Sequence, residues 1–154
     1  METSVVRQRV REALDRAGRP ADDVRGRRRV QMDEATRQYE LFLERIAVPL
    51  FRQIANVLVT EGHSFKVFTP GGSVRLMAER GGEDYIEVML DTKGAAPKLL
   101  GRVSHSRGGD VTQTELVLNA TADISALTEE DLLGYVLSEL ERFVEKAGKA
   151  GGAG

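Results

Sequence analysis

The sequence has no cysteine and no tryptophan, and five Phe and three Tyr are the only aromatic residues among its 154. Without cysteine there can be no disulfide, cysteine-ligated zinc, iron–sulfur cluster or thiol nucleophile. A chain of this length can hold a hydrophobic core without a metal or cofactor, so we expect none. No apolar run approaches the roughly 18 residues of a membrane-spanning helix, and the N-terminus lacks the apolar segment of a signal peptide. We therefore expect a soluble, cytoplasmic protein with no membrane association.

Charge is unevenly distributed along the chain. Residues 1–30 contain nine arginines and five acidic residues, a net charge of +4, which leaves −6 for the remainder. Apolar residues at Val5, Val6, Val10 and Leu14 predict a short helix ending near Ala17. Gly18, Pro20 and Gly26 then interrupt the pattern, so the following residues are predicted to form a linker or a mobile Arg-rich arm. Its candidate partner-binding residues are Arg25, Arg27, Arg28 and Arg29.

A second helix is predicted from Asp33 to Glu61. Its apolar residues recur at steps of three and four: Tyr39, Phe42, Leu43, Ile46, Leu50, Ile54, Val57 and Leu58. Pro49 lies inside this segment and cannot donate a backbone hydrogen bond, so we expect a kink or two abutting helices. At ~1.5 Å per residue the segment would be about 44 Å long, which is more than one small sheet requires. Part of it is therefore available to a partner.

Beyond Gly62 the apolar residues alternate, which indicates half-buried strands. The alternation covers Phe65 and Val67, Val74 and Leu76, and Ile86, Val88 and Leu90, and two further strands fit residues 98–106 and 111–119. Glycine-containing turns separate the strands at Pro70-Gly71-Gly72, Gly81-Gly82, Lys93-Gly94 and Gly108-Gly109. Connections this short predict a five-stranded antiparallel meander. One face is apolar, and the other carries Arg75, Glu79, Glu87, Arg102, Gln113 and Glu115.

The chain closes with a predicted helix that begins at Thr128, followed by three acidic residues in its first turn. Its apolar stripe comprises Leu132, Leu133, Val136, Leu137, Leu140, Phe143 and Val144. Gly148 is expected to end the helix, and residues 148–154 to form a disordered Gly/Ala tail. The predicted fold is a two-layer α+β sandwich: residues 31–147 form a single domain in which the central and C-terminal helices pack on the same face of the meander.

No catalytic or metal-binding motif stands out. The two histidines, His63 and His105, are far apart and form no HExxH pattern. Ser104 and His105 are adjacent in a predicted strand, so their side chains point to opposite faces, and no nucleophile elbow is present. The glycine pairs lack the lysine and helix start of a phosphate-binding loop. These observations favour a protein that is not an enzyme and binds no metal.

The Arg-rich arm has two interpretations. It could dock on an acidic protein surface, and residues 123–147 offer one with seven acidic residues against Arg142 and Lys146, a net charge of −5. It could also contact the phosphates of a nucleic acid. Asp22 and Asp23 beside the arginines, and a sheet without aromatic pairs on which bases could stack, weaken the second interpretation.

Met77 and Met89 are predicted to lie on the otherwise polar face of the sheet, where they could mark a subunit interface or a ligand groove. Together with the surplus helix length they favour a non-enzymatic protein-binding or assembly module. Such a module would act as a homo-oligomer or as an adaptor-like subunit of a larger, bacterial-type complex. An accessory nucleic-acid-binding protein that uses Arg25–Arg29 is the alternative. Binding of a small molecule in a pocket between the sheet and the helices is a third hypothesis, because such pockets leave little trace in a sequence.

Overall fold

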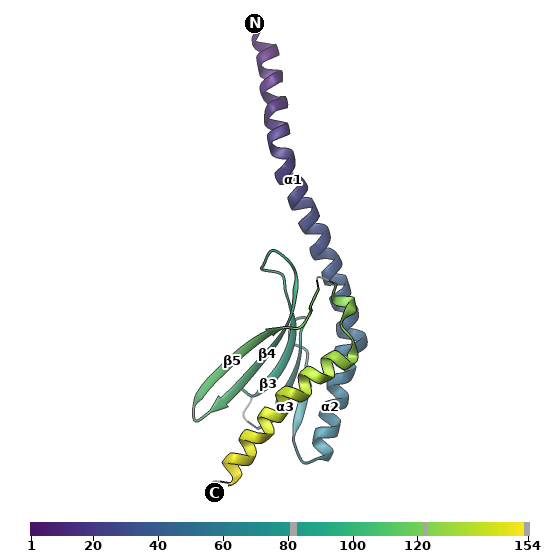
Figure 1. The fold of residues 1–154 in the computed structure, drawn as a ribbon, viewed down its shortest axis with the longest axis vertical. Coiled ribbons are helices and arrows are strands. Elements are labelled where there is room, and N and C mark those ends of the chain that lie inside the picture. The colour runs from purple at the N-terminus through teal and green to yellow at the C-terminus, as the bar shows by residue number, and fades with distance from the viewer. Residues whose placement is uncertain (81–82, 122, 153–154) are drawn as a thin grey trace.

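A long helix leads into a five-stranded sheet and a C-terminal helix, and its N-terminal part extends beyond both of them (Figure 1). The computed structural model describes residues 1–80, 83–121 and 123–152, with side chains described as far as Phe143. The helical elements are α1 (Thr3–Phe42), the π-helical turn η1 (Leu43–Ala47), α2 (Val48–Thr60), the 3-10 turn η2 (Ile124–Ala126) and α3 (Glu129–Gly152). The strands are β1 (Phe65–Phe68), β2 (Val74–Ala78), β3 (Tyr85–Asp91), β4 (Lys98–Arg107) and β5 (Asp110–Val117). The α+β class predicted from the sequence is confirmed.

The structure of the N-terminal region differs from the predicted short helix and irregular arm. The helix does not end near Ala17, and Arg25–Arg29 do not lie in an irregular linker, because α1 is continuous from Thr3 to Phe42 with Pro20 inside it. Helix propagation costs far less than nucleation, so a single Pro or Gly need not end a helix that continues on both sides. An acidic residue precedes an arginine by four positions at Glu12–Arg16, Asp15–Arg19 and Asp23–Arg27. This spacing and order support a helix locally.

At Pro49 the expected kink or pair of abutting helices is not seen as a break: the helical backbone is continuous, with a π-helical turn before the proline. The five-residue turn η1 ends at Ala47, and Pro49 lies in the first turn of α2. A proline there costs little, because the first backbone N–H groups of a helix have no partner within it. The π-turn, with its wider hydrogen-bonding pattern, lies directly before Pro49 and accommodates the missing backbone N–H of the proline.

The five strands form the predicted antiparallel meander, in the order β1-β2-β3-β4-β5. The β4–β5 hairpin pairs Arg107 with Asp110 and turns through Gly108 and Gly109, whose φ values are 59° and 91°. Two successive positive φ values are what a tight two-residue hairpin needs, which is the reason for the glycine pair. The Gly81-Gly82 turn lies outside the described residues.

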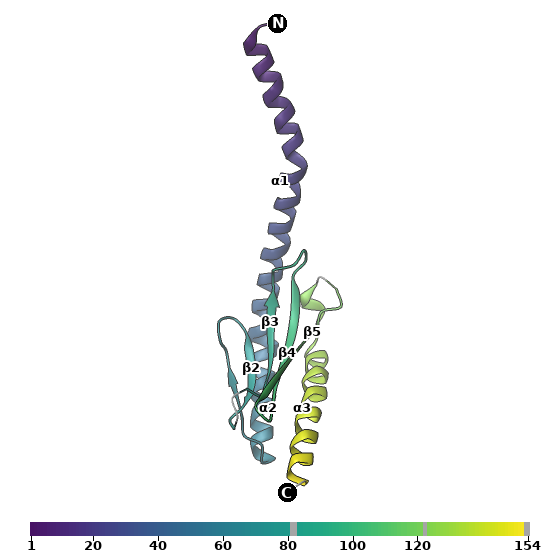
Figure 2. The same ribbon diagram turned by 90° about the vertical axis from the view of Figure 1, so that its left-hand side faces the viewer.

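The core lies between the sheet and the helices. On one sheet face, here called the inner face, Val74, Leu76, Ile86, Val88, Leu99 and Val103 are buried. They form one cluster with Phe42, Phe51 and Ile54 of the N-terminal helices and with Leu132, Val136 and Leu140 of α3. Both sets of helices therefore cover the same face, as predicted, and Figure 2 shows the opposite, outer face toward the viewer.

The helix α3 starts where the sequence predicts, but it ends later than predicted. Asp131 N donates to Thr128 Oγ1 at 3.1 Å, and Thr128 N donates to the Asp131 carboxylate at 3.0 Å. These reciprocal bonds lower the pKa of Asp131 below its ordinary value. The helix continues to Gly152 rather than ending at Gly148. Lys149 and Ala150 favour that continuation. The side chain of Val144 and residues 153–154 lie outside the described part of the chain.

Candidate functional site

The outer face of the sheet carries three cross-strand rows of side chains, defined by the strand register. The charged row contains Phe68, Arg75, Glu87, Arg102 and Glu115. On one side of it lies a row of Lys66, Met77, Tyr85, Ser104 and Gln113. On the other side lie Met89, Leu100 and Val117. The polar face predicted from the sequence is therefore an ordered band of alternating charges between two mixed rows.

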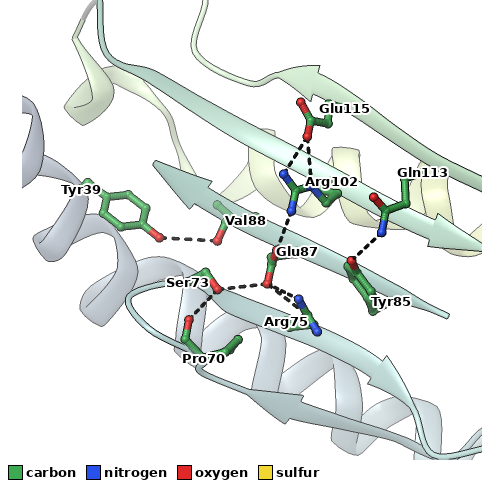
Figure 3. Close-up of polar contacts among 10 residues, drawn as sticks. All are labelled: Tyr39, Pro70, Ser73, Arg75, Tyr85, Glu87, Val88, Arg102, Gln113 and Glu115. Atoms are coloured by element: carbon green, nitrogen blue, oxygen red, sulfur yellow. Dashed lines mark hydrogen bonds and ion pairs between the residues drawn. The ribbon is translucent and has the colours of Figure 1, made fainter. Parts of the chain in front are cut away.

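Glu87 is the centre of the charged row (Figure 3), and its side chain is only 3% exposed. Its carboxylate accepts hydrogen bonds from Ser73 Oγ at 3.1 Å and from Arg75 Nε at 3.0 Å. Arg102 Nη1 approaches the other carboxylate oxygen at 3.9 Å. A buried carboxylate is tolerated only when such partners replace its water.

Arg102 links Glu87 to the edge strand. Its Nε and Nη2 donate to the same Glu115 oxygen at 3.0 Å and 2.8 Å, and these bonds raise the pKa of Arg102. Arg75 packs its guanidinium over the ring of Tyr85, with 3.9 Å from Cζ to the ring centroid. The row is thus a chain of mutually neutralising charges that spans four strands.

A cavity of about 500 Å³ opens where the charged row meets α1. Tyr39 lines it and donates from Oη to the carbonyl oxygen of Gly72 at 2.5 Å, next to the turn that leads into Ser73. Burial raises the pKa of Tyr39, and the negative charge of Glu87 raises it further, so the phenol stays neutral. Glu87, Arg75 and Tyr39 each interact with another group of the protein. These contacts favour a structural role for the three side chains over a role in proton transfer.

The two methionines lie on the outer face as the sequence indicates, and both are half-buried. The structure does not bring them together, because Met77 and Met89 belong to the rows on either side of the charged row. Met89 lines the cavity beside Tyr39, whereas Met77 lies opposite Tyr85. A single methionine patch is therefore absent from the outer face of the described sheet.

The four candidate arginines lie on an exposed part of α1. At about 100° of rotation per residue, Arg25, Arg28 and Arg29 fall on one side of the helix and Arg27 on the other. Arg28 Nη2 donates to the carbonyl oxygen of Gly94 at 3.1 Å, which ties the helix to the β3–β4 loop. The structure therefore brings three of the four arginines together.

α3 presents the acidic surface that the sequence indicates. Glu130 and Glu141 are exposed, and the helical repeat puts them on the same side as Leu137, whose exposed fraction is 46%. A groove of about 610 Å³ runs between α3 and the end of β5, lined by Leu116, Asn119, Asp131, Tyr135 and Glu139 among others. Burial raises the pKa of Tyr135, with Glu139 as a second cause.

The histidines contribute no candidate metal centre. His105 lies on the inner face with its ring 4.0 Å from that of Phe143, centroid to centroid, and His63 lines a separate cavity after α2. Among the residues that the structure describes, no three His, Cys, Asp or Glu side chains gather as metal ligands would.

Comparison with protein-family models, with curated proteins and with solved structures found no match. No helix within residues 1–80, 83–121 and 123–152 combines the length and the apolar character needed to cross a membrane.

Proposed function

We propose that this protein is a non-enzymatic assembly module, in which the exposed half of α1, residues 3–30, docks on α3 of a neighbouring copy. The observation that carries the proposal is the exposure of this helical half: apart from half-buried Gly18, every one of its residues is exposed. At ~1.5 Å per residue it spans about 42 Å. In proteins most of the stability of a helix comes from packing one of its faces, and none of residues 3–30 packs into the described core of its own chain.

The exposed half also carries apolar side chains without a place in the core. Val5, Val10, Leu14 and Val24 have exposed fractions between 39% and 66%. Their exposure supports docking on a partner, because burying them would remove apolar surface from water.

Charge complementarity supports α3 as the acceptor. The basic helical half carries nine arginines, and on α3 the exposed Leu137 lies between Glu130 and Glu141. The same chain cannot supply both sides, because α1 runs away from the sheet and its N-terminus lies at the opposite end of the molecule from α3 (Figure 1). Docking therefore needs a second copy.

The test compares full-length charge-reversal variants by light scattering. Arg25→Glu with Arg29→Glu should lower the assembled mass, as should Glu130→Lys with Glu141→Lys. Mixing these two variants should restore assembly, because each supplies the intact surface that the other lacks. The control Arg45→Glu with Arg52→Glu changes two exposed arginines on other parts of the helical region.

An unchanged mass in both charge-reversal variants contradicts the proposal. So does a mixture that assembles no better than its components.

Nucleic-acid binding is the second candidate, favoured by the three arginines on one side of α1. It predicts binding that weakens steeply with salt and is lost when Arg25, Arg28 and Arg29 are changed to Ala. Absorbance at 260 nm alongside light scattering distinguishes the two, since protein assembly brings no nucleotide signal. Binding that does not depend on salt contradicts this candidate.

A further inference from the structure

β5 is the least protected strand of the sheet. It lies at the edge of the strand order, and all eight of its residues are exposed. Three of them are large and apolar: Val111, Leu116 and Val117, with exposed fractions of 46%, 56% and 46%. A long edge strand with apolar side chains is a template for pairing with another chain.

The opposite edge differs in the features that discourage pairing. β1 has only four residues, and Lys66 lies there with its ammonium 5.1 Å from the ring centroid of Phe68. Short edge strands and edge lysines are common protections against unwanted pairing. The sequence of β5, residues 110–117, contains no Lys, Arg or Pro. The protection of one edge and not the other leaves β5 as the edge that is open to pairing.

The sequence of β5 is complementary to itself in one antiparallel register. With Thr114 opposite Thr114 of a second copy, Gln113 lies opposite Glu115 and Val111 opposite Val117. Each of these pairs keeps both residues on the outer face, since positions of the same parity share a face. Amide–carboxylate and Val–Val pairs are favourable across strands, and no two like charges are opposed.

We propose that two copies of this chain pair through β5 about a two-fold axis at Thr114, which joins their sheets into one of ten strands. The pairing also brings the exposed inner-face Leu116 of each copy beside the other's strand. It uses a surface distinct from the basic half of α1 and goes beyond the assembly proposed above. Because a two-fold axis perpendicular to the sheet reverses directions in its plane, the two α1 helices leave the dimer at opposite ends.

Cysteine cross-linking in the full-length chain tests the register, and the absence of native cysteine makes each substitution a single reactive site. In Thr114→Cys the two thiols face each other across the axis, with Cα atoms about 5 Å apart, which suits a disulfide. In the matched control Thr112→Cys the same register separates the two Cα atoms by roughly 14 Å. Mild oxidation should give a covalent dimer of Thr114→Cys and leave Thr112→Cys monomeric on a non-reducing gel.

Mixing Thr112→Cys with Leu116→Cys sharpens the test, because this register places those two positions opposite each other. The mixture should form the mixed disulfide in preference to either homodimer. Equal cross-linking at positions 112 and 114, or none at 114, overturns the proposal.

A charge variant provides an independent readout. Thr114→Lys places two lysines directly opposite at the axis and should lower the mass measured by light scattering, which falls toward the 16.9 kDa of one chain when Arg25→Glu and Arg29→Glu are also present. Thr112→Lys, which faces Leu116, should have the smaller effect. Cross-linking of Thr114→Cys should persist when Arg25→Glu and Arg29→Glu are added, so failure of the α1 contact and failure of the β5 contact are separable. Loss of the cross-link in that combined variant, or a Thr114→Lys mass equal to wild type, contradicts the proposal.

Discussion

The two parts of α1 share one backbone helix and differ in what stabilises it. Residues 31–42 bury Ala35, Tyr39 and Phe42 against the sheet and α3, whereas residues 3–30 contribute no residue to the core. The first part is held by its packing, whereas the second part continues the same helix cooperatively and is supported along its length by charge spacing. Helical structure alone therefore does not show that a segment belongs to the folded core, and substitutions in the two parts should have different consequences.

The largest expected difference concerns apolar side chains. Phe51→Ala removes a side chain with 0% exposure and should lower the free energy of unfolding by about 3–5 kcal/mol. Leu14→Ala in the exposed half should change the free energy of unfolding of the monomeric chain by less than about 0.5 kcal/mol, because Leu14 is 66% exposed there. Urea unfolding followed by circular dichroism measures both. A loss above about 1 kcal/mol for Leu14→Ala, at a concentration where the protein is monomeric, would mean that the exposed half packs on its own chain.

A buried and an exposed carboxylate give the next difference. Glu87→Ala leaves the guanidinium groups of Arg75 and Arg102 without their shared partner and should cost about 3 kcal/mol. The carboxylate of Glu12 lies on the exposed helix and accepts a hydrogen bond from Gln8 at 3.3 Å. Glu12→Ala should therefore lower the free energy of unfolding by well under about 1 kcal/mol. The same unfolding measurement applies. Equal effects would show that Glu87 does not stabilise the fold as the partner of Arg75 and Arg102.

Replacing glycine by alanine should destabilise the protein in the sheet and stabilise the exposed half of α1. A Cβ at Gly101 would collide with the ring and hydroxyl of Tyr135, so Gly101→Ala should destabilise by about 1–3 kcal/mol. At Gly26 a Cβ meets nothing within 4 Å, and Gly26→Ala should favour the helix by about 1 kcal/mol. Thermal unfolding reports the first and helical ellipticity the second. A stabilised Gly101→Ala would mean that Tyr135 does not pack on β4.

The sequence predicted which residues of the candidate site share a face of the sheet. It did not predict which of them are neighbours. Alternation put Arg75, Glu87, Arg102 and Glu115 on one face, and the glycine turns set the strand order. Which charges are adjacent depends on the register of three strand pairs, a long-range property. Alternation likewise put Met77 and Met89 on that face, while only the register showed that the charged row separates them.

The sequence by itself determined the five strands, the alternation that separates their two faces, the helical irregularity beside Pro49 and the Thr128 cap of α3. These features follow from period-two alternation, glycine conformation, a missing N–H group and a side-chain cap, all of which act over a few residues. Only the tertiary structure decided that α1 continues through Gly18, Pro20 and Gly26, that Glu87 is buried between two arginines, and that β5 is exposed on both faces. Those outcomes depend on helix cooperativity and on which surfaces cover one another, and neither can be read from a local pattern.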